Sequence, residues 1–155
     1  MEIIVENKKA RFEFFLLEEF EAGIVLLSSE VKSLRERKAN ISDAYIIENN
    51  SEIWLRNMHI AEYKSANKKN HKIRRERKLL LRKKEISKLI DGIKIAGITV
   101  IPLSVYFNSK GLAKTKIAIA KGKKLYDKRA IIKQREWDRE KNRFSKIEVH
   151  NKICF

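Results

Sequence analysis

Two apolar segments joined by a short turn constrain the fold of this chain more than any other feature. Residues 98–107 are rich in β-branched and aromatic side chains, and residues 112–120 alternate between apolar and polar positions. The residues between them, Asn108–Gly111, have the composition of a turn, so the pair predicts an antiparallel hairpin. The lone Pro102 predicts a sheet edge or a bulge, because proline cannot donate a ladder hydrogen bond.

Alternation along 112–120 predicts which side chains of that strand face the core. We expect Ile117 and Ile119 to point inward and Lys116 and Ala118 to point outward. Further strands are expected at residues 11–20, 24–27, 44–47 and 53–60, with a turn at 49–51 that makes the last two a hairpin.

Two segments predict helices within the same region. Ser28 and Ser29 can cap a helix that runs to about Lys38. Residues 79–95 carry apolar side chains at helical spacing and reach Asp91-Gly92 near their end. About six short strands with two or three helices predict a mainly β fold, a small closed or partly open β-barrel.

Charge is concentrated in two blocks. The chain has a net charge of +16. Residues 64–84 and residues 110–146 each carry a net +10, and residues 85–109 between them are neutral. Blocks this dense attract polyanions, so the pattern predicts two contact surfaces, for nucleic acid first and anionic membrane second. The alternative is a pair of solvated lysine-rich faces.

The first block lies in a long polar segment. Residues 61–78 are expected to form a loop, and a loop of this length in a small domain is usually functional. It combines Lys and Arg for phosphates with Asn67, Asn70 and His71, which can bind sugars and base edges. Structured RNA suits this composition better than duplex DNA does.

The second block runs into a C-terminal segment with good helix formers but a thin apolar stripe. We expect it to be disordered when free and helical on an anionic surface, because it cannot bury enough apolar area alone. A helix packed through Ile132 and Trp137 is the alternative.

Residues for catalysis or metal binding are sparse. The single cysteine excludes an intramolecular disulfide and a Cys-based zinc site, and the three histidines are far apart. The chain lacks phosphate-loop and nucleophile-elbow motifs. It has no apolar run near the ~18 residues of a membrane helix, and we expect no signal peptide at its start. The sequence therefore predicts a soluble intracellular binding protein with no cofactor or metal. A metal-dependent nuclease or modifying enzyme stays an alternative.

Several motifs in order resemble one family. They are NKK at 7–9, EAGIVL at 21–26, EVKSLR at 30–35, NxxNH at 67–71, RKLLL at 77–81, GxTxxPLxxYF at 97–107 and GKKLYDKR at 122–129. In this order and spacing they resemble the small protein B (SmpB) family, the SsrA-binding proteins of bacterial trans-translation. The resemblance covers about residues 7–143, and the motifs are specific as a set.

The resemblance implies a fold, a function and partners. The fold is an OB-type antiparallel six-stranded β-barrel over residues 1–125, with two or three peripheral helices, followed by a basic tail over residues 126–155 that is helical on the ribosome. The function is that of a non-enzymatic cytoplasmic adaptor, expected to be a monomer. It binds the tRNA-like part of transfer-messenger RNA and delivers that RNA to stalled ribosomes, at the small-subunit decoding centre and the messenger channel. Elongation factor Tu and alanyl-tRNA synthetase act on the same RNA.

Residues are carried over only where the motifs match. The RNA-binding set implied for this chain is Asn7, Lys8, Lys9, Glu30, Lys32, Asn70, His71, Arg74 and Arg77. Lys32, Arg74 and Arg77 are expected to bind phosphates. Glu30 is expected to accept hydrogen bonds from base or sugar donors, with a helix-start carboxylate as its alternative.

The set implied to face the ribosome lies in the tail. Its members are Tyr126, Asp127, Lys128, Arg129, Lys133, Arg135 and Trp137. Tyr126 is expected to stack on a decoding-centre base, with an aromatic cap at a strand end as its alternative.

Four positions depart from the family pattern. Ser28 and Arg37 stand where glycine is common, Ile73 replaces a usual proline, and Arg82 replaces a common histidine. We expect these departures to make the basic loop, Tyr63 to Lys78, freer.

A structural protein that binds ribosomal RNA through the same charge blocks is the alternative function.

Overall fold

The computed structural model describes residues 2–64 and 70–153, with residues 143–153 as backbone only. The chain divides into two compact units, Met1–Gly122 and Lys123–Phe155. The first unit holds nine strands and the first three helices among the described residues, and the second holds one long helix.

The strands of the first unit follow the chain in the order β1 to β9. Their bounds are Glu2–Glu6, Phe14–Ile24, Ala39–Asn40, Tyr45–Asn49, Glu52–Arg56, His59–Ile60, Arg77–Leu80, Ile98–Phe107 and Ala113–Gly122. The helices α1 to α4 span Ala10–Glu13, Ser28–Arg35, Lys83–Ile93 and Leu125–Ile153.

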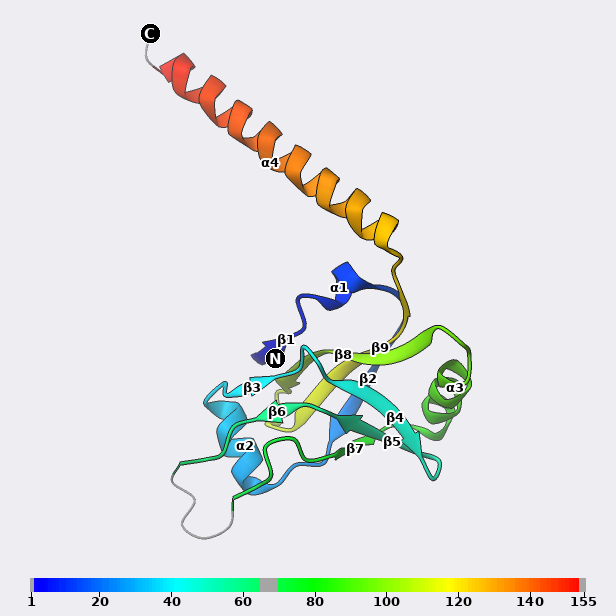
Figure 1. Cartoon of the computed structure of the whole chain (residues 1–155). Coiled ribbons are helices and arrows are strands. Elements are labelled where there is room, and N and C mark those ends of the chain that lie inside the picture. The colour runs from blue at the N-terminus through cyan, green and yellow to red at the C-terminus, as the bar shows by residue number, and fades with distance from the viewer. Residues whose placement is uncertain (1, 65–69, 154–155) are drawn as a thin grey trace. The chain divides into compact units, whose positions relative to one another are not determined.

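Six antiparallel strands form a closed ring (Figure 1). The order around the ring is β8-β4-β5-β7-β2-β9, and β9 pairs back onto β8. Strand β1 lies outside the ring beside β8, and β3 and β6 form a separate two-stranded sheet. The expected mainly β architecture with six antiparallel strands is thus present.

The hairpin that most constrained the fold is confirmed. Strand β8 pairs with β9 from Ile98↔Lys121 to Phe107↔Ala113, and the register shifts between Pro102 and Ser104. The expected bulge is therefore there. Ile117 and Ile119 are in the main core and Lys116 is exposed, as expected.

Ala118 has the expected orientation, but it is not exposed. It faces away from the ring interior but is fully buried. A second small apolar cluster covers it, in which Ala10 of α1 and the half-buried Phe14 pack against that face. Alternation predicts which side of a strand a residue takes, but it does not predict that another segment covers the outer side.

Four segment predictions were wrong. Residues 53–60 were expected as one strand, but they are divided between β5 and β6, which lie in different sheets. Residues 11–20 and 24–27 were expected as two strands, but α1 is followed by a single strand, β2, that ends at Ile24. Residues 79–82 were expected in a helix. Residues 77–80 form β7 instead, because they pair with β2 on one side and β5 on the other.

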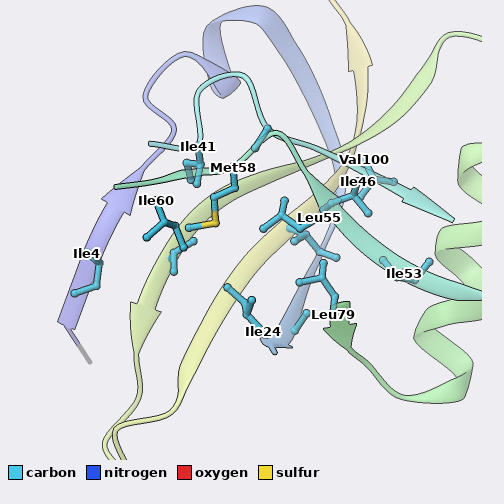
Figure 2. Packing of buried hydrophobic residues seen from close by; sticks show 14 of the residues in the cluster. Ile4, Ile24, Ile41, Ile46, Ile53, Leu55, Met58, Ile60, Leu79 and Val100 are labelled. Carbon is cyan, nitrogen blue, oxygen red and sulfur yellow. The ribbon is translucent and has the colours of Figure 1, made fainter. Parts of the chain in front are cut away.

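The main core fills the inside of the ring (Figure 2). Ile24, Leu55, Leu79 and Val100 come from four different ring strands and meet there. Burying side chains of this size stabilises the fold by roughly 1.5–3 kcal/mol each before entropy is counted. This core makes the ring a rigid scaffold for the loops around it.

Helix α3 packs closely against the ring. Leu89 is fully buried, and a Cβ built at Gly92 would lie 3.1 Å from Cδ1 of Ile119. Glycine at that point lets the helix approach β9.

Within the described residues, no helix is long and apolar enough to cross a membrane.

Candidate nucleic-acid interface

A buried ion cluster joins helix α2 to the basic loop. Glu30 and Arg77 are each 0% exposed, and Oε1 of Glu30 lies 2.9 Å from an Arg77 guanidinium nitrogen. Arg75 donates to both oxygens of the same carboxylate, at 3.2 and 2.8 Å. One carboxylate thus ties together the start of β7 and the end of the loop.

The local chain explains why this carboxylate is in place. Glu30 is in the first turn of α2, and its Oε2 accepts the Leu27 backbone N–H at 2.8 Å, which caps the helix. Arg77 also donates to backbone oxygens of Met58 and Arg75 at 2.8 Å and of Ile73 at 3.3 Å. The buried charges are therefore paired and hydrogen-bonded, as burial requires.

The electrostatics follow from these contacts. Burial by itself would raise the pKa of the Glu30 carboxyl, but hydrogen bonds from Arg75 and Leu27 and the nearby positive charges leave that pKa below its usual value. Burial lowers the pKa of Arg77, and Glu30 opposes that change. The carboxylate stays ionised at neutral pH.

These contacts change the expected roles of Glu30 and Arg77. Glu30 was expected to reach RNA donors, and Arg77 to bind phosphate. Both side chains are buried with protein partners in this structure, so neither presents its charge at the surface. The structure instead makes them supports of the loop, and their contact with RNA stays a prediction.

His71 and Asn70 also hold the loop from within. The His71 side chain is 4% exposed, with Nε2 3.1 Å from the Ile60 carbonyl oxygen and Nδ1 2.9 Å from Ser29 Oγ. A carbonyl only accepts, so Nε2 donates to it, and Nδ1 shares a hydrogen bond with the Ser29 hydroxyl. Asn70 bridges the backbone N–H and carbonyl of Tyr63. Asn67 lies outside the described residues.

The expected phosphate ligands Lys32 and Arg74 are at the surface. Lys32 Nζ lies 5.4 Å from the ring centroid of Tyr63, a cation–π contact. Arg74 is exposed and donates to Asn57 Oδ1 at 3.0 Å. Both are accessible to an RNA backbone.

The N-terminal part of the RNA set lies elsewhere on the unit. Lys8 and Lys9 are exposed, whereas Asn7 is only 7% exposed. Asn7 Nδ2 donates to the Pro102 carbonyl oxygen at 3.4 Å, and among the described residues its Oδ1 has no hydrogen-bond partner. Asn7 and Lys8 line a cavity of about 330 Å³ together with Lys116.

The tail set lies in the second unit, at the start of α4. Asp127 Oδ2 accepts the Lys124 backbone N–H at 3.2 Å, which caps the helix. Tyr126 is 66% exposed and Trp137 is 58% exposed. Residues Leu125–Ile153 form a helix in this structure, and both the disorder expected for the free protein and the helix expected on the ribosome stay predictions.

Sequence reasoning missed Arg75 and a polar groove beside Arg74. Arg75 and Arg77 are two residues apart, so an extended chain puts them on one side, and this spacing could have indicated a shared acidic partner. The groove has a volume of about 370 Å³ and is lined by residues from four separate segments of the chain. They are Arg37, Lys38, Ala39, Asn40, Asp43, Asn57, His59, Ala61 and Arg74. Among the side chains that the structure describes, no three acidic, His or Cys residues gather as a metal site would need.

Comparisons with known proteins agree on one relationship. The family model described as "SmpB protein" matches residues 4–147. An "SsrA-binding protein" of Wolbachia sp. subsp. Drosophila simulans (strain wRi) is 81% identical over 94% of this chain and 98% of its own length. An "SsrA-binding protein" of Anaplasma marginale (strain St. Maries) is 60% identical over 96% of this chain and 100% of its own length.

A solved structure is similar as well. A chain from the structure described as "tmRNA-SmpB: a journey to the center of the bacterial ribosome" superposes with a TM-score of 0.67 at 40% identity. The match covers 78% of this chain and 85% of the other.

Proposed function

Because the chain belongs to the SmpB protein family, we propose that it binds transfer-messenger RNA and acts with that RNA on the ribosome in trans-translation. The observation that carries this proposal is the 81% identity to an SsrA-binding protein over 98% of that protein's length. At that identity and coverage, the RNA-binding unit and most of the tail are shared. The similar chain from a tmRNA–SmpB structure supports the same partners.

The first unit is proposed to bind the tRNA-like part of the RNA. Its ring of six antiparallel strands would serve as an OB-type barrel, a scaffold that suits irregular RNA shapes. Lys32 and Arg74 would bind phosphates, since both are exposed and neither is held in a buried ion pair. Glu30, Arg75 and Arg77 would hold the loop in its binding shape.

The tail is proposed to act in a second step on the ribosome. It would follow the empty messenger channel as a helix, with Tyr126 to Arg129 at the decoding centre and Lys133, Arg135 and Trp137 beyond. The cationic, largely polar surface of α4 supports this role, because ribosomal RNA is the polyanion such a helix would meet. We infer that the protein is a non-enzymatic adaptor, a cytoplasmic monomer, and that elongation factor Tu and alanyl-tRNA synthetase act on the RNA it carries.

The direct test measures binding to three labelled RNAs in the same buffer. They are transfer-messenger RNA, an elongator tRNA, and a fragment of small-subunit ribosomal RNA of matched length. The proposal expects transfer-messenger RNA to bind most tightly and to resist competition by the other two. Equal binding to all three, or preference for the ribosomal fragment, would support a structural ribosomal-RNA-binding protein instead.

A further inference from the structure

The polar groove beside Arg74 has the size and fixed walls of a binding site. Its volume of about 370 Å³ is at the lower end of the roughly 300–1,000 Å³ typical of small-molecule sites. Asn40 and His59, which both line it, are register partners in the β3–β6 sheet. Asn57 joins two further lining residues, Asp43 and Arg74. Its Nδ2 donates to the Asp43 carbonyl at 3.1 Å, and its Oδ1 accepts from Arg74.

Two residues of the groove wall have a backbone conformation that side chains disfavour. Arg37 and Asn57 both have a φ of 58°, in the left-handed region that favours glycine. Arg37 ends α2 as the left-handed residue of a Schellman motif, with its N–H on the Leu34 carbonyl and the Lys38 N–H on the Ser33 carbonyl. Glycine is the usual residue there, so an arginine is retained at a conformational cost.

The charges of the groove combine cations with one carboxylate. Arg37, Lys38 and Arg74 give it a positive rim. The surface pair of Arg37 with Glu2, at 3.1 Å, has both side chains 63% exposed, so an RNA phosphate can replace Glu2 at little cost. Among the described residues, the carboxylate of Asp43 has no side-chain partner.

A carboxylate in a cationic groove selects among nucleotides. Guanine presents two adjacent N–H donors, N1–H and N2–H, on its Watson–Crick edge, and a carboxylate can accept both. Adenine presents an acceptor, N1, in place of the first donor, so a carboxylate repels it. The same groove therefore offers cationic side chains that can bind phosphates at its rim and, within it, an acceptor that prefers guanine.

We propose that this groove binds one unpaired guanine nucleotide of an RNA, with Arg37 and Arg74 on its phosphates and the Asp43 carboxylate on its Watson–Crick edge. This inference rests on the proposed RNA-binding function and adds a base preference to it. His59 also lines the groove, and its imidazole ring would stack on the base.

The test uses the full chain and short labelled RNA hairpins that differ only in one bulged nucleotide, G or A. The wild-type protein should bind the bulged-G hairpin about fivefold or more tightly than the bulged-A hairpin. Asp43→Asn should abolish that preference, because an amide presents donors as well as an acceptor. Arg37→Gly should weaken binding of both hairpins and lower the log–log salt slope by about 0.7–0.9.

Arg37→Gly also serves as the folding control, because glycine suits the left-handed conformation and should leave unfolding in urea unchanged or shifted to higher urea. Equal binding of both hairpins by the wild type, or a guanine preference that survives Asp43→Asn, would overturn the inference. Free GMP that binds as tightly as the bulged-G hairpin would overturn the RNA assignment. These failures leave transfer-messenger RNA binding intact, whereas a wild-type protein that does not bind that RNA refutes the proposed function itself.

Discussion

The carboxylate of Glu30 accepts hydrogen bonds from two arginines and one backbone N–H with no access to solvent. Moving these charges out of water is costly, and their mutual attraction offsets that cost only while every partner is present. The cluster therefore adds little stability compared with an apolar core, but it constrains the positions of the segments that it joins. It fixes where α2, the loop end and β7 meet, and that fixes which cations remain at the surface.

Glu30→Gln should destabilise the protein by about 3 kcal/mol, because it leaves the buried Arg77 without its counter-charge. Unfolding in urea, followed by circular dichroism, measures the change. Glu52→Gln is the matched control, since it removes the same charge from the exposed pair with Lys78 and should cost about 0–1 kcal/mol. A loss below 1 kcal/mol for Glu30→Gln would show that the cluster is not a structural constraint.

The stabilisation from Glu30 should be lost in acid. Its pKa in the folded protein lies below the usual value of 4.5, so the folded state binds a proton less readily than the unfolded state does. The contribution is therefore complete above about pH 4.5 and falls as the pH drops through the lower, folded pKa. Glu21, whose pKa is also lowered, is common to wild type and variant and cancels in the comparison.

Unfolding curves of wild type and Glu30→Gln at a series of pH values between 7 and 3 test this dependence. The difference in unfolding free energy should be constant near neutrality and shrink below pH 4.5. A difference that grows on acidification would have the wrong sign and would contradict the charged, hydrogen-bonded carboxylate.

For single residues, the sequence predicts which side chains are candidates for RNA binding better than it predicts which of them are exposed. Lys32 and Arg74 were expected at the surface and lie there. Arg77 and His71 were expected to contact RNA, yet each is buried by partners distant in sequence, Glu30 in α2 and the Ile60 carbonyl in β6. A basic residue in a basic segment gives no local signal that a carboxylate elsewhere in the chain will enclose it.

Among the elements, the β8–β9 hairpin and β7 show opposite outcomes. The hairpin was predicted closely, because alternation and turn chemistry are both local. Strand β7 was mistaken for the start of a helix, since a short apolar run is compatible with either structure. Its pairing with β2 and β5 decides the outcome, and those strands lie far away in sequence. Helix α1 and strand β1 were also missed, as both are short.

Helix α4 is the element that we propose to act on the ribosome, and its first turn can be tested apart from the rest. Asp127→Ala with Lys128→Ala and Arg129→Ala should leave the affinity for transfer-messenger RNA within about twofold, because the loop proposed to bind that RNA lies in the other unit. The same variant should lose most peptide tagging on ribosomes stalled at a messenger without a stop codon. Quantitative binding and a reconstituted tagging reaction measure the two effects.

The control replaces the same charges further along α4, with Asp138→Ala, Arg139→Ala and Lys141→Ala. Its net charge change is identical, but it keeps the residues that we propose to lie at the decoding centre, so it should retain more tagging than the first-turn variant. Equal loss of RNA binding and tagging in the first-turn variant would contradict a separate second step. Equal tagging defects in the two triple variants would assign the effect to charge alone.

Over the whole molecule, the first charge block lies in the first unit and the second block spans both units. The first block, residues 64–84, flanks the buried Glu30 cluster and supplies exposed cations such as Arg74. The second, residues 110–146, continues from β9 into α4. A net charge of +16 predicted only a polyanionic partner. Because part of that charge lies in the first unit and part in α4, we propose two successive RNA contacts.

The RNA that the full-length protein retains in its native cell is the sharpest test of whether it carries transfer-messenger RNA. The protein should be purified with its bound RNA at moderate salt, and that RNA should be sequenced. Transfer-messenger RNA should be the dominant species relative to its cellular abundance. Retention of ribosomal RNA in proportion to ribosomes, with transfer-messenger RNA not enriched, would contradict the proposed function.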